Sequence, residues 1–133
     1  MAVCVIWSDC PEPIPLRTTL TSSIEKLIIT KQADHFLVRN EGLFDAMVHF
    51  ILVELKKKYP WITFNVVLPN YPITPLSKEE LDEAYIPECI TKGTISGKEL
   101  RDRWMLSAAD IILLYGNLNV KIHEGINVVK IIE

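Results

Sequence analysis

The sequence predicts an α/β fold, a three-layer sandwich built on a mainly parallel sheet of about five strands. Short segments that are apolar at nearly every position alternate along the chain with longer segments of helical periodicity. The clearest unit, residues 35–68, reads strand, polar turn, helix of crossover length and strand. Continuously apolar strands are typical of a parallel sheet covered on both faces, and such crossovers are almost always right-handed.

Five segments are predicted as strands because they are apolar almost throughout. They are residues 2–7, 35–38, 62–68, 110–115 and 127–132. The connection between the last two, residues 116–125, is shorter than the dozen or so residues that a parallel crossover usually needs. The final crossover is therefore either abbreviated, with a shortened helix, or the last strand pairs differently, as an antiparallel edge.

Four helices are predicted between these strands, at about residues 18–31, 42–59, 77–85 and 98–108. Thr18 or Thr21 could cap the first, and Asn40 is the expected cap of the second. Ser77 and Glu80 have the spacing of a capping box. Each helix is expected to bury one apolar stripe. These stripes are Leu20, Ile24, Leu27 and Ile28 in the first, Phe44, Met47, Val48, Ile51, Leu52 and Leu55 in the second, and Leu100, Trp104 and Ser107 or Ala108 in the fourth.

Composition limits the class of protein. The chain has 133 residues, 49% of them hydrophobic, and a net charge of −3, which suits one folded domain spanning residues 1–133 and makes nucleic acid an unlikely partner. No apolar run reaches the ~20 residues of a membrane span, and no signal peptide is recognisable. The three cysteines form no CxxC pair, so reduced thiols in a cytoplasmic protein are the simplest interpretation. No metal-ligand spacing and no cofactor motif occurs.

Ligands of open α/β sheets bind at the carboxyl ends of the strands, so the residues that follow the strands are the candidate site. In the turn after residues 35–38, Asn40 and Gly42 could serve a phosphate or simply form the bend, and Arg39 could pair with an anion, with Glu41 or with Asp9. Ligand contacts are expected from Trp7, Ser8, Asp9, Arg39, Asn40, Glu41, Gly42, Asp45, Tyr71, Arg101, Tyr115, Gly116 and Asn117.

Two groups of these residues have alternative interpretations. Trp7 could stack on a base or pack beneath the proline-containing segment 8–15. Arg101 could read an anion, although the run Arg101–Asp102–Arg103 is more typical of an exposed helix face with local ion pairs. No Ser-His-Asp or Cys-His set can be assigned, so no catalytic residue is predicted.

Four strings in order, NEGLFDAM, ELKKKYP, IPE and LRDRWMLSAADIILLY, resemble a bacterial group of Rossmann-like proteins in the SLOG superfamily, named for the Smf/DprA and LOG proteins. The resemblance covers nearly the whole chain and implies a doubly wound sheet with a pocket for a nucleotide or a nucleotide-derived metabolite. The match is partial, because Arg39 replaces a glycine, Trp7, Ser8 and Asp9 replace a Gly-His-Arg string, and Leu118 follows Gly116 and Asn117 where a second glycine-rich string is usual. Such glycines let phosphate approach backbone amides, so the resemblance implies a reduced pocket.

Three functions follow from these observations. The first is non-catalytic binding of a nucleotide or related metabolite. The second is a domain without ligand binding that associates with another protein or with a second copy of itself, through a sheet face left open by the short last crossover. The third is a nucleoside monophosphate N-glycosidase (phosphoribohydrolase), which the absent Gly-Gly-Gly-x-Gly-Thr string of LOG-type enzymes disfavours.

Overall fold

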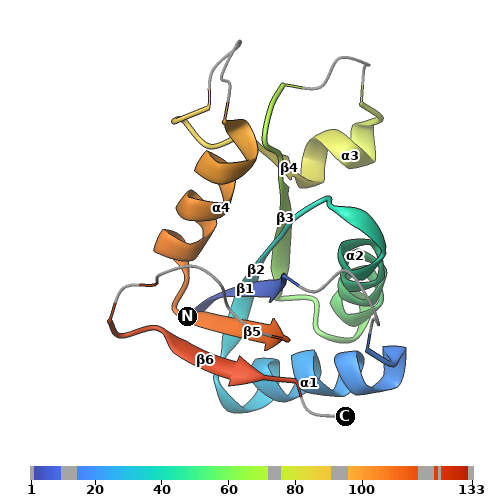
Figure 1. The fold of residues 1–133 in the computed structure, drawn as a ribbon. Coiled ribbons are helices and arrows are strands. Elements are labelled where there is room, and N and C mark those ends of the chain that lie inside the picture. The colour runs from blue at the N-terminus through green and yellow to red at the C-terminus, as the bar shows by residue number, and fades with distance from the viewer. Residues whose placement is uncertain are drawn as a thin grey trace.

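The computed structural model describes residues 2–9, 15–71, 76–90, 96–116, 122 and 124–131. They form an α/β sandwich in which one parallel sheet lies between helices, a Rossmann-like arrangement (Figure 1). The strands are β1 (Ala2–Ser8), β2 (Ala33–Val38), β3 (Thr63–Val67), β4 (Ala84–Tyr85), β5 (Ile111–Tyr115) and β6 (Asn127–Lys130). The helices are α1 (Arg17–Thr30), α2 (Gly42–Lys58), α3 (Lys78–Glu83) and α4 (Gly97–Ala108).

The sheet has the strand order β4-β3-β2-β1-β5-β6, and every neighbouring pair is parallel. The predicted α/β class is confirmed, with six strands in place of about five. The last strand pairs with β5 in parallel, so the antiparallel alternative is wrong. Because β2 and β5 flank β1 on opposite sides, the chain reverses its direction of winding at β1, which is the position where open α/β sheets bind ligands.

The strand that was not predicted, β4, lies where the third helix was expected to continue. α3 ends at Glu83, and Ala84 turns to extended geometry with ψ 143°. Ala84 and Tyr85 then pair with Val66 and Val67 of β3. The predicted capping box is present, because the Ser77 hydroxyl accepts from the Glu80 amide at 3.1 Å and the Glu80 carboxylate accepts from the Ser77 amide at 3.0 Å.

The two faces of the sheet are covered by different helices. α1 and α2 pack on one face and α4 on the other (Figure 1). Side chains of β1 alternate between the two cores, since Cys4 and Ile6 lie with α1 and α2 whereas Val5 and Trp7 lie with α4. The expected stripes of α1 and α2 are buried, apart from Met47, which is partly buried.

The predicted stripe of α4 is wrong by one position. The buried residues of this helix are Gly97, Arg101, Met105 and Leu106, whereas Trp104 is half-buried and stacks on Tyr85. A Cβ on Gly97 would lie 2.0 Å from the Pro69 carbonyl oxygen, so glycine lets the start of α4 sit against the backbone that follows β3. This close contact sets the rotation of α4 and turns Arg101 inward. No helix in the described segments is long and apolar enough to cross a bilayer.

Candidate functional site

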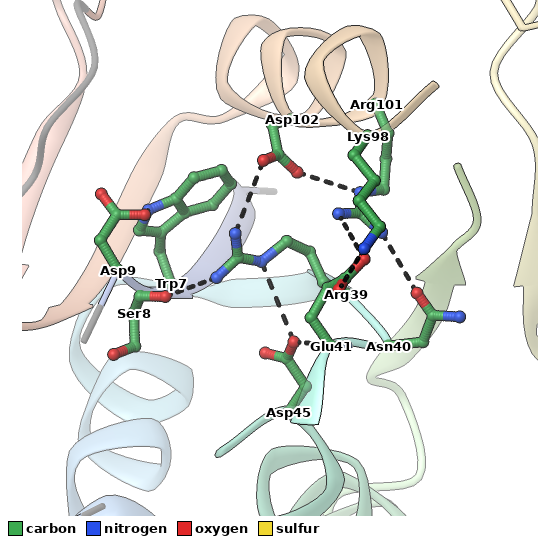
Figure 2. Close-up of polar contacts among 10 residues, drawn as sticks. All are labelled: Trp7, Ser8, Asp9, Arg39, Asn40, Glu41, Asp45, Lys98, Arg101 and Asp102. Carbon is green, nitrogen blue, oxygen red and sulfur yellow. Dashed lines mark hydrogen bonds and ion pairs between the residues drawn. The ribbon is translucent and has the colours of Figure 1, made fainter. Parts of the chain in front are cut away.

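A cavity of about 420 Å³, here called the polar cleft, opens at the carboxyl ends of β1 and β2 beneath α4. Residues after the two strands form its floor, and the first turns of α4 form its roof (Figure 2). Its lining consists of Ser8, Asp9, Arg39, Glu41, Gly42, Leu43, Phe44, Asp45, Lys98, Arg101 and Asp102. Three segments far apart in the sequence therefore meet at the edge where the fold predicts a ligand.

Arg39 occupies the centre of the cleft. Its guanidinium lies 3.9 Å from the centre of the Trp7 ring, and Nη2 donates to the Ser8 carbonyl oxygen at 2.6 Å. Nη1 is 3.6 Å from Asp102 Oδ2, and Nε is 3.9 Å from Asp45 Oδ2 (Figure 2). The side chain is only 10% exposed, and Nε is a buried nitrogen that has no hydrogen-bond partner within the described part of the chain. This nitrogen therefore interacts with Asp45 through charge at 3.9 Å and not through a hydrogen bond.

Arg101 ties α4 to the turn between β2 and α2. Its guanidinium donates to Asn40 Oδ1 at 3.1 Å, to Glu41 Oε1 at 3.1 Å and to Asp102 Oδ1 at 3.0 Å, while the side chain is 1% exposed. The interpretation of this run as an exposed face is therefore wrong for Arg101. It holds for Arg103, which is 70% exposed and pairs with Glu99 four residues earlier on the same helix.

Positive and negative groups nearly balance in the polar cleft. Lys98 Nζ is 3.2 Å from Glu41 Oε2, so this one carboxylate contacts both Lys98 and Arg101. Burial acts to raise the pKa of Glu41, but the hydrogen bonds from Lys98 and Arg101 outweigh burial and lower the pKa below its ordinary value. The lining as a whole carries Arg39, Lys98 and Arg101 against Asp9, Glu41, Asp45 and Asp102. An anionic ligand must therefore displace a carboxylate from at least one cation.

Asp45 is the buried acid of the cleft, with its side chain 2% exposed. Its Oδ2 accepts from the Glu41 amide at 2.8 Å, and α2 begins after Glu41, whose side chain makes no cap hydrogen bond. The expectation that Asn40 caps α2 is wrong, because the Asn40 side chain accepts from Arg101 instead. Burial raises the pKa of Asp45 above its ordinary value, and the nearby Arg39 guanidinium offsets only part of this effect.

A second hollow of about 610 Å³, here called the α2–α3 cavity, lies on the other side of the β2–α2 turn. It is lined by Arg39, Asn40, Gly42, Asp45, Ala46, His49, Val66, Leu68, Asn70, Leu76, Glu80, Glu83 and Ala84. Arg39, Gly42 and Asp45 line both hollows. Gly42 has φ +84°, a left-handed conformation that residues other than glycine adopt at a cost, and it forms the ridge between the two.

The structure brings together most of the residues that the sequence indicated. Ser8, Asp9, Arg39, Glu41, Gly42, Asp45 and Arg101 line the polar cleft, and Asn40 holds Arg101 from below. Trp7 supports the floor of the cleft, but its side chain is 1% exposed and Arg39 covers its ring, so the expectation of a base stacked on Trp7 is wrong.

Three of the remaining candidates, which are Tyr71, Tyr115 and Gly116, are not among the lining residues of the two hollows. Tyr71 is exposed and does not appear among the lining residues of either one. Tyr115 stacks on Phe44 with ring centres 6.0 Å apart, and Gly116 ends β5 with φ +89°. Asn117 falls outside the described residues.

Lys98 and Asp102 were not among the expected site residues. Asp102 lies between two arginines in the sequence. Lys98 precedes Arg101 by three residues, a spacing that places Lys98 and Arg101 on one side of a helix. That spacing is a usable signal only after the rotation of α4 is known. The same is true of His49, Glu80 and Glu83, which α2 and α3 bring to the second hollow.

No group of three or more His, Cys, Asp or Glu side chains in the described segments could hold a metal ion. No protein-family model matches the chain, and no curated protein matches its sequence. The polar cleft must therefore be interpreted from its own geometry.

Proposed function

We propose that the polar cleft binds a nucleotide or a nucleotide-derived metabolite without converting it. The observation that carries the proposal is the convergence of Arg39, Lys98 and Arg101 in one cavity at the carboxyl ends of β1 and β2. Guanidinium groups suit phosphate because their donors match its oxygens in pairs. The cavity volume lies within the range of small-molecule sites.

Glu41 occupies the place where a phosphate group would make its strongest contacts. Its two carboxylate oxygens accept from Lys98 and Arg101, as two oxygens of a phosphate would. The Glu41 side chain is 32% exposed, so it can turn toward water without breaking a packed core. We therefore infer that the ligand displaces Glu41 and takes over its two cations.

The composition of the lining supports binding without turnover. Among the described residues of the polar cleft there is neither histidine nor cysteine, so no side-chain pair of the Ser-His or Cys-His kind can generate a nucleophile there. Glu41, Asp45 and Asp102 each form an ion pair with an arginine. These carboxylates orient the cations.

The test is a thermal-shift screen with a nucleotide library, followed by calorimetry of the best ligand. Glu41→Gln removes the competing charge and is expected to strengthen binding about fivefold or more, since it removes an anion that holds two cations. Asn40→Ala removes an acceptor that holds Arg101 and is expected to weaken binding. Glu99→Gln is the matched control and should leave affinity unchanged, because Glu99 is 68% exposed and pairs with the exposed Arg103.

Two outcomes would reject nucleotide binding without turnover, and a third would reject the displacement of Glu41. If no nucleotide shifts the melting temperature and the protein forms a concentration-dependent dimer by light scattering, association is the better account. Release of free base from a nucleoside monophosphate over a long incubation would instead indicate an N-glycosidase. Weaker nucleotide binding by Glu41→Gln would show that this carboxylate contacts the ligand directly and does not compete with it.

A further inference from the structure

The contacts of Glu41 in the polar cleft describe the chemical group that can replace it. Its two carboxylate oxygens lie on different cations, with Oε2 at 3.2 Å from Lys98 Nζ and Oε1 at 3.1 Å from Arg101 Nη2 (Figure 2). The carboxylate thus presents two oxygens that share one negative charge. A ligand group that takes over both contacts must present at least two oxygens in the same way.

The other nitrogens of Arg101 already have protein partners. Nε donates to Asp102 Oδ1 at 3.0 Å, and Nη1 donates to Asn40 Oδ1 at 3.1 Å. The side chain is 1% exposed, so these two hydrogen bonds fix the orientation of the guanidinium. Displacement of Glu41 therefore releases one nitrogen of Arg101 and the ammonium group of Lys98.

Arg39 is engaged in the same manner and adds no further released cation. Its Nη2 donates to the Ser8 carbonyl oxygen at 2.6 Å, and its Nη1 lies 3.6 Å from Asp102 Oδ2. Nε lies 3.9 Å from Asp45 Oδ2, and the side chain is 10% exposed. The two carboxylates that balance the charge of Arg39 stay in the cleft when Glu41 leaves it.

The remaining charge of the cleft limits the charge of the ligand. With Glu41 turned toward water, the described lining keeps three cations and three carboxylates, which are Arg39, Lys98 and Arg101 against Asp9, Asp45 and Asp102. The desolvation cost of an ion grows with the square of its charge. A lining without net charge does not offset that cost for a second negative charge, so a singly charged group is favoured over a doubly charged one.

We propose that the polar cleft prefers a nucleotide whose phosphate is a phosphodiester over one that ends in a phosphomonoester. This inference rests on the proposed function and adds the class of phosphate that the site accepts. A phosphodiester has two non-bridging oxygens and one negative charge, as the Glu41 carboxylate has. One oxygen accepts from Lys98 and the other from Arg101. A phosphomonoester is largely doubly charged at pH 7.5, because its second pKa is about 6, and its third oxygen gains no released cation.

Adenosine 5′-phosphate and its methyl ester are matched probes, since they share the nucleoside and differ by one methyl group and one charge. Calorimetry on the full chain at pH 7.5 is expected to show that the methyl ester binds about tenfold more tightly, because the second charge faces the remaining carboxylates. Adenosine has no group that can displace Glu41 and is expected to bind more weakly than either phosphate.

The pH dependence separates the effect of charge from that of shape. Below about pH 6, adenosine 5′-phosphate binds a proton and becomes singly charged like its ester. Its affinity should therefore approach that of the ester between pH 7.5 and 5.5. The charged groups of the described lining face both probes alike, so the ratio of the two affinities reports the charge of the ligand. These groups are Asp9, Arg39, Glu41, Asp45, Lys98, Arg101 and Asp102.

Two pairs of variants locate the effect. Lys98→Met should weaken the methyl ester several-fold, whereas Lys57→Met should not, although each lysine is 71% exposed and pairs with a glutamate. Asp102→Asn removes one of the remaining carboxylates and should reduce the preference for the ester several-fold. Glu99→Gln, on the same helix, should leave the preference unchanged. Melting temperatures near that of the parent protein would confirm that each variant is folded.

The inference is overturned if adenosine 5′-phosphate binds at least as tightly as its ester at pH 7.5, or if the ratio of their affinities does not change on acidification. In both cases nucleotide binding itself would still stand. It is also overturned if Lys98→Met and Lys57→Met weaken the ester equally, or if adenosine binds as tightly as the ester. If none of the three compounds binds, the proposed function fails together with this inference.

Discussion

Replacement of Arg101 by methionine tests the central contact of the site. The substitution keeps the length and the apolar stem of the side chain but removes a guanidinium that is 1% exposed and makes three hydrogen bonds. Hydrogen bonds to charged groups contribute about 1.5–3 kcal/mol each. Part of the stability lost with these hydrogen bonds is recovered, because the variant no longer has the desolvation cost of a buried guanidinium. In addition, Glu41 and Asp102 are 32% and 27% exposed, so their carboxylates can regain water.

The net effect expected for Arg101→Met is a loss of about 2–3 kcal/mol in the free energy of unfolding, which for a domain of this size corresponds to a fall of roughly 6–10 °C in melting temperature. Urea unfolding followed by circular dichroism measures the first quantity, and a thermal scan measures the second. The cost should be well above that of an ordinary surface substitution.

Arg103→Met on the same helix is the matched control. Arg103 is 70% exposed and makes one ion pair with Glu99, so its loss should change the free energy of unfolding by no more than about 0.5 kcal/mol. If the two variants were equally stable, Arg101 would lie on a solvated face, as its sequence context suggested, and the rotation assigned to α4 would be incorrect.

Three further predictions concern other parts of the chain. Gly97→Ala should destabilise the protein by about 2 kcal/mol or more in urea unfolding, because the new Cβ would lie 2.0 Å from the Pro69 carbonyl oxygen; in a helix without this contact the same change would stabilise. Burial raises the pKa of Cys4 to about 12, so iodoacetamide at pH 8 should label the exposed Cys89 in the folded protein and Cys4 only after unfolding, as mapped by mass spectrometry. Because burial raises the pKa of Asp45 above 3.8, the stability that this group contributes is present at lower pH and is lost as pH rises through its folded-state pKa. The Asp45→Asn variant should lack this loss. The prediction is contradicted if the free energies of unfolding of the parent and the variant change in parallel between pH 3.5 and 7.

The sheet was predictable because its strands are short apolar runs that depend little on their neighbours. β1 and β5 are interior strands and are apolar at almost every position, so their assignment needed no tertiary information. β4 could not be found in this way. Its two residues follow an acidic helix without a break in pattern, and only pairing with Val66 and Val67 makes them a strand.

The site was only half predictable for a similar reason. The turn after β2 is local, and Asn40, Gly42 and Asp45 mark it in the sequence as a bend that opens a helix. The contribution of α4 is not local, because it depends on which side of the helix faces the sheet. Gly97, Arg101 and Met105 lie four residues apart, but a glycine and an arginine do not register as an apolar stripe. Only the contact of Gly97 with Pro69 identifies that side as the inner one.

The β2–α2 turn separates the polar cleft from the α2–α3 cavity. Asp45, in the first turn of α2, accepts from the Glu41 amide and pairs with Arg39. Its side chain therefore fixes the two turn residues that precede the helix. Glu41 is thereby directed toward the cations of α4, whereas Asp45 stays beneath Gly42 at the boundary of both hollows. A ligand in the polar cleft can displace the partly exposed Glu41 but not the buried Asp45, which must remain in place to hold Arg39. Neutralising these two carboxylates should consequently have opposite effects on nucleotide affinity, with Glu41→Gln strengthening binding and Asp45→Asn weakening it. The same calorimetric titration measures both, and a change of the same sign in the two variants would show that the turn does not separate the two roles.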